Sequence, residues 1–319
     1  MKHNRKITAI LVAMFFVTQL IGLAVIYAYS PHEVKTIDPV TGETRIEKVK
    51  QDLPYGVEPP ELEEKTSLGT IIISMIIAIS LIILLSKIRA AFFLKLWFFI
   101  VVCLSIALSL NAFLIYVGAS RITYFSIIAL LFAVPLGYIK IYKRNIIVHN
   151  LTELLIYPGI AAVFVPILGL WSVIVLLILI SLYDIYAVWH SGIMQQMAQY
   201  QIQELKFFAG FFIPYVSKKQ RAELEKLKQD AKKPGKKSDK KIKVNLAILG
   251  GGDVVFPIIT AGVILRLWGF AEAITVSIFA TLALLSLFVL AKKGKFYPAM
   301  PFISAGLFLG IAVVGLFHL

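Results

Sequence analysis

Two aspartates, Asp184 and Asp253, lie inside long apolar stretches of the 319-residue chain. A carboxylate in such a stretch is costly, so it marks a candidate functional site. Two carboxyl groups that meet do not both ionise easily, and the pair then shares one proton. Aspartic proteases use this arrangement to activate water and to protonate their substrate. A structural polar pair, or the proton relay of a transporter, needs the same two residues, so the aspartates alone leave these interpretations open.

The stretches around the two aspartates belong to a chain that is 59% hydrophobic and only 16% charged. Soluble chains are closer to about 45–50% apolar and about 25% charged, so the composition predicts an integral membrane protein and excludes general disorder. Because Cys103 is the only cysteine, a disulfide framework is excluded as well. We expect Cys103 itself to be a buried small hydrophobe.

A helix of roughly 20 residues crosses about 30 Å of hydrocarbon, and apolar stretches near this length recur along the chain. We therefore predict an all-α, polytopic fold with nine transmembrane helices. The predicted helices cover residues 7–29, 67–86, 91–117, 122–139, 146–165, 170–189, 244–265, 271–291 and 297–317. The first follows three basic residues, as the core of a cleaved signal peptide would. Its apolar run of about 23 residues exceeds the roughly 7–15 of a signal peptide, so we interpret it as a retained helix.

The basic residues predict the orientation of the chain. The net charge is +14, from 32 Lys and Arg against 18 Asp and Glu. With a cytoplasmic N-terminus, 25 of the 32 basic residues fall in cytoplasmic segments, and each of these segments carries several. The positive-inside rule therefore predicts that the N-terminus is cytoplasmic and the C-terminus outside.

Two polar regions divide the chain into three parts. Residues 1–216 form an N-terminal membrane part with six helices, an extended outside loop at 30–66, and an amphipathic extension at 191–216 that we expect to be an interfacial helix. Residues 217–243 form a Lys-rich, flexible cytoplasmic loop, expected to contact anionic lipid rather than nucleic acid. Residues 244–319 form a C-terminal membrane part with three helices.

Three acids remain at membrane depth: Glu153, Asp184 and Asp253. From the cytoplasmic ends of their predicted helices, Asp184 lies about six residues in and Asp253 about nine. At roughly 1.5 Å per residue these depths are about 9 and 13 Å, so the two aspartates can meet at one level. Glu153 is expected to pair with a basic residue of the preceding loop. The histidines lie near helix ends and no H-E-x-x-H pattern occurs, so we expect no metal and no other cofactor.

The residues before Asp253 are unlike those of an ordinary helix. Three glycines at 250–252 precede it directly, and glycines weaken a helix and let another backbone approach closely. A peptide bond inside a helix is protected, so a protease in the bilayer must bind its substrate unwound. Extended pairing with an exposed enzyme backbone is one physical way to do so. Pro298 and Pro301 similarly keep the last predicted helix from beginning regularly.

Three short motifs resemble those of a known family. Tyr183-Asp184, the Gly-Gly-Gly-Asp run that ends at Asp253, and Pro298-Ala299-Met300 resemble the YD, GxGD and PAL motifs of presenilin and signal peptide peptidase. The order of the motifs along the whole chain is also the same. The resemblance implies a nine-span intramembrane aspartyl protease in which Asp184 and Asp253 are the catalytic pair. It further implies that the following residues bind substrate or shape the active site: Tyr183, Leu249, Gly250, Gly251, Gly252, Pro298, Ala299 and Met300.

The chain looks most like the presenilin branch, whose members also have a cytoplasmic N-terminus, and within it like the archaeal homologues. This resemblance implies an integral protein of a prokaryotic, archaeal cell membrane. Gly251 stands where presenilins have Leu, so their substrate preference is not transferred to this chain. Met300 replaces the Leu of PAL, a swap that conserves side-chain volume.

The predicted function is hydrolysis of peptide bonds within transmembrane segments of membrane proteins, by water activated between the two aspartates. An ion-coupled transporter or a cation channel, with the two acids as a relay, is the alternative. No internal repeat of the kind common in transporters is evident in the sequence. A non-catalytic membrane scaffold is a third interpretation. The sequence carries no signal for an oligomeric state.

Overall fold

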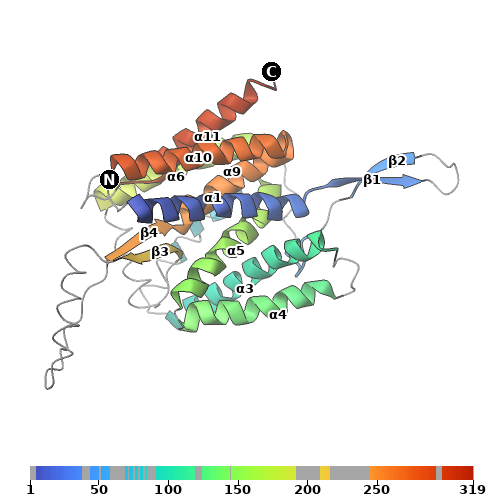
Figure 1. Cartoon of the computed structure of the whole chain (residues 1–319), viewed down its shortest axis with the longest axis horizontal. Coiled ribbons are helices and arrows are strands. Elements are labelled where there is room, and N and C mark those ends of the chain that lie inside the picture. The colour runs from blue at the N-terminus through green and yellow to red at the C-terminus, as the bar shows by residue number, and fades with distance from the viewer. Residues whose placement is uncertain are drawn as a thin grey trace.

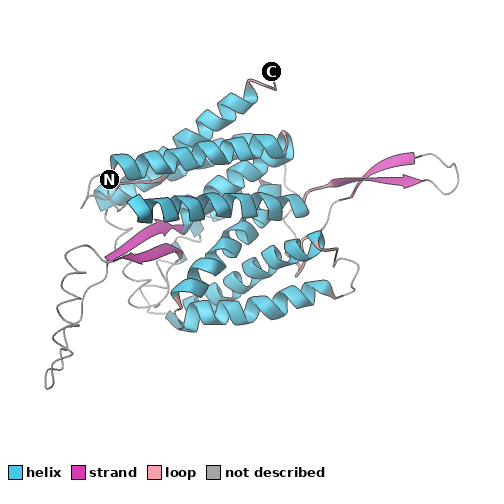
Figure 2. Ribbon diagram, viewed as in Figure 1, coloured by secondary structure: helices cyan, strands magenta, loops and turns pink. Residues whose placement is uncertain are grey.

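The structure is a computed structural model of the whole chain. It describes residues 5–37, 44–49, 52–57, 91–118, 124–143, 145–191, 209–215, 245–291 and 297–318, together with scattered residues between 69 and 84. Most of the described residues belong to long apolar helices packed side by side (Figure 1). The predicted predominantly helical fold is therefore confirmed, with exceptions in two short sheets (Figure 2).

Most of the helices match the predicted spans within about three residues at each end, and α9 begins later than predicted. They are α1 (Arg5–Ala28), α3 (Ala91–Tyr116), α4 (Phe125–Tyr138), α5 (Ile146–Phe164), α6 (Leu170–Tyr186), α9 (Gly251–Leu267), α10 (Phe270–Leu290) and α11 (Met300–Gly315). Shorter turns extend three of them: the π-helical η2 (Ile139–Lys143) and η4 (Ala187–Ser191), and the 3₁₀ turn η3 (Val165–Ile167). Of the second predicted span, only scattered residues are described, and these are helical.

Six helices in the described part of the chain are long and apolar enough to cross a membrane. They are α1, α3, α4 with η2, α5 with η3, α6 with η4, and α10. The apolar helix α11 has 16 residues and α9 has 17, so both are shorter than a full span. Both shortened helices begin next to a residue of the candidate site, and their late starts are part of how the site is built.

Two antiparallel sheets correct the all-α prediction. β1 (His32–Ile37) pairs with β2 (Thr44–Val49), and β3 (Gly210–Tyr215) pairs with β4 (Asn245–Gly250). The first pair forms a hairpin within the predicted extended loop and projects beyond the helices (Figure 1).

The second sheet shows that two predicted helical segments were wrong in part. The predicted interfacial helix at 191–216 ends in strand β3, while residues 192–208 lie outside the described residues. The predicted span at 244–265 begins as strand β4, and its helix starts only at Gly251. Aromatic and branched residues in Phe-Phe-Ile favour an extended strand, and the glycines at 250–252 disfavour helix N-terminal to Asp253.

Helix α1 lies at the centre of the bundle, between a group formed by α3, α4 and α5 and a group formed by α9, α10 and α11 (Figure 1). Small residues allow the close crossings, as is common between membrane helices. A Cβ atom added to Gly22 of α1 would lie 2.3 Å from Ile258 of α9. One added to Gly159 of α5 would lie 2.0 Å from the backbone oxygen of Ser105 in α3.

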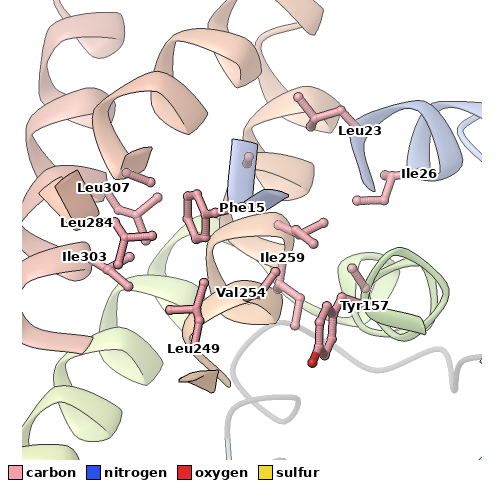
Figure 3. Close-up of a cluster of buried hydrophobic side chains, with 14 of the residues drawn as sticks. Phe15, Leu23, Ile26, Tyr157, Leu249, Val254, Ile259, Leu284, Ile303 and Leu307 are labelled. Atoms are coloured by element: carbon pink, nitrogen blue, oxygen red, sulfur yellow. The ribbon is translucent and has the colours of Figure 1, made fainter. Parts of the chain in front are cut away.

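The apolar core surrounds the first turns of α9. Phe15 of α1, Leu249 of β4 and Val254 of α9 are all fully or almost fully buried, and Figure 3 shows them around the start of that helix. A polar contact also reaches the start of α9, where Gln19 Nε2 of α1 donates a 3.2 Å hydrogen bond to the backbone oxygen of Val254. The start of α9 is therefore held by α1 through both apolar and polar contacts. Cys103 is buried, as predicted.

Candidate active site

Asp184 lies near the end of α6, two residues before that helix ends, and its side chain is 7% exposed. Its carboxylate meets the start of α11. Asp184 Oδ2 accepts a 3.0 Å hydrogen bond from the backbone N–H of Met300, and the backbone N–H of Ala299 also donates to this carboxylate. The first N–H groups of a helix have no partner within the helix. Asp184 therefore caps the N-terminus of a helix more than one hundred residues away in the chain.

The prolines of the last motif explain why these N–H groups are available. Pro298 precedes the helix and Pro301 occupies its first turn, so α11 begins only at Met300. Proline is tolerated in the first turn of a helix because that N–H would be unpaired anyway. The prediction that the segment does not begin as a regular helix is confirmed. Pro298 is buried and Ala299 is half-buried, while Met300 is 3% exposed and part of the core.

Asp253 is the third residue of α9, and Gly250 is the N-cap residue, with φ −64° and ψ 148°. The backbone N–H of Gly250 donates a hydrogen bond to the Asp253 carboxylate. This is one half of a capping box, in which an acid at the third helical position reaches back to the N-cap N–H. A Cβ atom at position 250 would lie 3.2 Å from Asp253 Oδ2, so glycine leaves this carboxylate its space.

The structure brings the two aspartates together. Helices α6 and α9 contact each other, and the carboxyl groups of Asp184 and Asp253 are near enough for their charges to repel. Each acid accepts backbone N–H bonds at the start of a helix, which is also the positive end of the helix dipole. The N-termini of α9 and α11 thus converge on one pair of carboxyl groups. Asp253 lies at the helix start rather than about nine residues into a helix, because the residues before Gly251 form strand β4 instead of helix.

The remaining predicted site residues differ in their surroundings. Leu249 is 3% exposed and belongs to the core. Gly251 lies against the ring of Tyr157, because an added Cβ atom would be 3.0 Å from both Cε1 and Oη of that side chain. Gly252 is exposed and has space around it. Tyr183 is 51% exposed, so the residue next to Asp184 points out of the core.

Sequence reasoning missed Tyr157, which lies beside the start of α9 (Figure 3). Its hydroxyl oxygen interacts with the charges of Glu153 and Asp253, and it has no hydrogen bond of good geometry to any described residue. The predicted pairing of Glu153 with a basic residue of the preceding loop is confirmed, because Lys140 Nζ lies 2.5 Å from Glu153 Oε1. His149, Glu153 and Tyr157 are spaced four residues apart on α5, and this spacing was the available signal.

Two neighbouring carboxyl groups, each bound by backbone N–H groups, thus lie inside a bundle of apolar helices. The chain belongs to the family described as signal-peptide peptidase, presenilin aspartyl protease, which matches residues 53–318. The predicted family and the predicted multi-pass membrane location are thus confirmed.

Two solved structures have a similar fold, and both are of a presenilin family intramembrane aspartate protease. The one in space group C222 has a TM-score of 0.58 at 18% sequence identity, over 97% of this chain and 99% of the other. The one in space group P2 has a TM-score of 0.56 at 18% identity, over 96% of each chain. No curated protein matches the sequence. Neither the transporter nor the channel alternative is supported by these similarities.

Proposed function

We propose that this protein hydrolyses peptide bonds within transmembrane segments of other membrane proteins, with Asp184 and Asp253 as the catalytic pair. The observation that carries this proposal is the convergence of two helix N-termini on the two neighbouring carboxyl groups. A pair held in this way needs little reorganisation when a reaction changes its charge, which is the main source of electrostatic catalysis.

In the proposed reaction, the pair shares one proton and holds a water molecule between its carboxyl groups. The ionised carboxylate accepts a proton from the water as its oxygen attacks the scissile carbonyl carbon, and the protonated carboxyl donates to the carbonyl oxygen. Collapse of the tetrahedral intermediate then breaks the C–N bond, and the amine leaves with a proton from the pair. The enzyme forms no covalent bond to the substrate at any step.

Strand β4 offers a way to bind an unwound substrate. Its partner β3 covers one edge, and Phe212 of β3 pairs in register with Ile248. The backbone groups of Phe212 bond to Asn150 instead of β4. In an antiparallel ladder, hydrogen-bonded and non-hydrogen-bonded residue pairs alternate, and Phe212 with Ile248 is a non-hydrogen-bonded pair. The backbone groups of Ile248 therefore face away from β3. We infer that an extended substrate adds to this edge of β4, which leads directly into Asp253.

We also propose nine transmembrane helices with the N-terminus in the cytoplasm and the C-terminus outside, supported by the distribution of basic residues. The three parts at 1–216, 217–243 and 244–319 remain part of this proposal. In this orientation both aspartates open toward the cytoplasmic half of the bilayer. The Lys-rich segment 217–243 faces anionic lipid at the cytoplasmic surface.

The experiment combines purified protein in detergent with a single-span substrate and measures product masses. Asp184→Asn and Asp253→Asn should each lower the cleavage rate by about 10²–10⁴-fold or more, the range that general acid–base catalysis contributes. Glu272→Gln is the matched control, because this acid lies in the first turn of α10 and pairs with His318 at 3.4 Å. Wild-type activity in either aspartate variant would refute the proposal, as would an equal loss in the control.

A further inference from the structure

Helix α5 carries a group of buried polar residues that the proposed reaction does not use. His149 and Glu153 are 4% and 1% exposed, and Lys140 of η2 beside them is 4% exposed. Glu153 Oε1 lies 3.4 Å from His149 Nε2, and Lys140 Nζ lies 3.4 Å from His149 Nδ1. A buried ion pair contributes little net stability compared with apolar residues of the same volume. The stability of the bundle therefore does not by itself explain this cluster.

The polar residues of α5 bind the backbone of strand β3. Glu153 Oε1 accepts a 3.2 Å hydrogen bond from the N–H of Gly210, and His149 Nε2 lies 2.8 Å from the carbonyl oxygen of the same residue. The amide of Asn150 donates to the carbonyl oxygen of Phe212 at 2.9 Å and accepts from its N–H at 3.2 Å. Both backbone groups of Gly210 and of Phe212 are thus paired with side chains.

This pairing repeats the pattern of a neighbouring β-strand. In an antiparallel ladder every second residue directs both its backbone groups to the same neighbour. Gly210 and Phe212 are two residues apart and direct theirs to α5, while β4 pairs with the opposite edge. Aromatic contacts reinforce the arrangement, because the rings of His149 and Phe212 lie 4.4 Å apart and those of Tyr157 and Phe211 lie 5.7 Å apart. Helix α5 therefore takes the place of a third strand.

We propose that His149, Asn150 and Glu153 are positioning residues that fix the register in which substrate meets the catalytic pair. They hold β3, the ladder holds β4 to β3, and β4 leads through Gly250 into Asp253. A substrate strand on β4 then has one register relative to the two aspartates. This inference rests on the proposed function, and it adds that cleavage at a single bond depends on residues that touch neither substrate nor water. A slip by one residue turns every side chain to the other face and moves the cleaved bond.

The test uses Asn150→Leu and Asn150→Ala, which remove both bonds to Phe212 without leaving a buried charge. In the single-span substrate assay, KM should rise about tenfold, as expected for the loss of one to two hydrogen bonds, while kcat changes less than about threefold. Product masses should show additional cleavage at bonds next to the original one. On the Asp253→Asn background the same Asn150 variants should bind the uncleaved substrate about tenfold more weakly, a readout that needs no catalysis.

The matched control is Asn145→Ala. Asn145 is the N-cap of the same helix, and its side chain also makes two hydrogen bonds, to the N–H groups of Ile147 and Val148 at 2.9 and 3.2 Å. It binds no described residue of β3. This variant should retain the KM, the substrate affinity and the product masses of the wild type.

Three outcomes separate this inference from the proposed function. Unchanged affinity and product masses in both Asn150 variants would overturn the inference and leave the function intact. Equal changes in Asn145→Ala would also overturn it, because the effect would then follow from a weaker α5 in general. Cleavage by Asp253→Asn would instead refute the function, whereas the binding comparison on that background would still decide whether Asn150 governs substrate affinity.

Discussion

The two aspartates of the candidate site are held by different kinds of support. Asp184 sits near the end of a regular helix and is fixed by the backbone of a distant segment, Ala299 and Met300. Asp253 is fixed by the backbone of its own helix start, at Gly250. The position of the Asp184 carboxylate therefore depends on how α6 packs against α11. The position of the Asp253 carboxylate depends on the local sequence at the start of α9.

The surroundings extend this difference. Around Asp253 the support is polar, because β4 is held by β3 and β3 is held by the side chains of α5. Beyond the backbone bonds to its own carboxylate, the described support around Asp184 is mainly apolar, with Met300 and Ile303 in the core and a side-chain hydrogen bond between Ser181 and Ser304. Polar contacts fix direction and register, while apolar packing tolerates small shifts. Polar support around Asp253 therefore suits a site in which this carboxyl group must stay aligned with a substrate strand on β4.

The largest expected effect comes from breaking the polar support at Glu153. Glu153→Gln leaves Lys140 buried without its counter-ion, and removing one partner of a buried pair costs about 3–5 kcal/mol. The double variant Lys140→Met with Glu153→Met should recover most of this free energy of unfolding while losing the bond to Gly210. Denaturant titration in detergent measures the free energy of unfolding of the single and the double variant. Equal stability of Glu153→Gln and the wild type would show that the pair is not effectively buried.

The next effect concerns the contact between Gly251 and Tyr157. In Gly251→Leu the new side chain must displace the Tyr157 ring, which already lies 3.0 Å from the position of the Cβ atom. Overpacking of this kind costs about 1–3 kcal/mol. In the double variant with Tyr157→Ala, the two losses should fall short of additivity by at least about 1 kcal/mol, because the clash disappears.

Gly252→Ala is the control for this prediction. An added Cβ atom there has only the Phe256 ring nearby, at 3.8 Å, so the free energy of unfolding should change by less than about 0.5 kcal/mol. Additive losses in the double variant, or an equal loss in the control, would mean that Tyr157 does not occupy the space beside Gly251.

Removing either aspartate should also lower the stability of the protein, but by different amounts. Asp184→Ala leaves the N–H groups of Ala299 and Met300 without their acceptor in the core, which costs about 2 kcal/mol. Asp253→Ala removes one cap contact at the start of α9 and should cost about 0.5–1 kcal/mol. Thermal unfolding of the two inactive variants measures the difference. A larger loss in Asp253→Ala would reverse the assignment of the two kinds of support.

The sequence predicted the parts of the candidate site that are chemically rare in a membrane. Asp184, Asp253 and Glu153 stand out because charges are costly there, and the prolines near Met300 stand out because they cannot continue a helix. That Glu153 pairs with a basic residue of the preceding loop was expected, whereas Lys140 as that residue comes from the structure. Nine spans could be predicted because the hydropathy of a segment depends only on the residues of that segment. The match between predicted and observed helix ends at α5, α6 and α10 follows from the same signal.

The second sheet could not be predicted for a physical reason. Residues 244–250 are apolar and run directly into α9, and a short buried strand cannot be distinguished from a helix by periodicity. Its partner β3 lies far away in the sequence, because Leu249 pairs with Phe211, 38 positions earlier, and Asn245 pairs with Tyr215, 30 positions earlier. Tyr157 was missed because its spacing of four residues from Glu153 places it on the same face of α5, but nothing in the sequence shows that the start of α9 packs against that face.

A small expected effect tests the apolar support of Asp184. Ser181 Oγ of α6 donates a 2.9 Å hydrogen bond to Ser304 Oγ of α11, and it is a side-chain link between these helices at the level of the candidate site. Ser181→Ala should lower the free energy of unfolding by about 1 kcal/mol. The control Ser286→Ala removes an exposed bond within α10, to the backbone oxygen of Ala283, and should change it by less than about 0.5 kcal/mol. If apolar packing holds α6 against α11, Ser181→Ala should also keep the wild-type product masses, in contrast to the Asn150 variants. New cleavage positions in Ser181→Ala would show that the alignment of Asp184, too, depends on polar contacts between side chains.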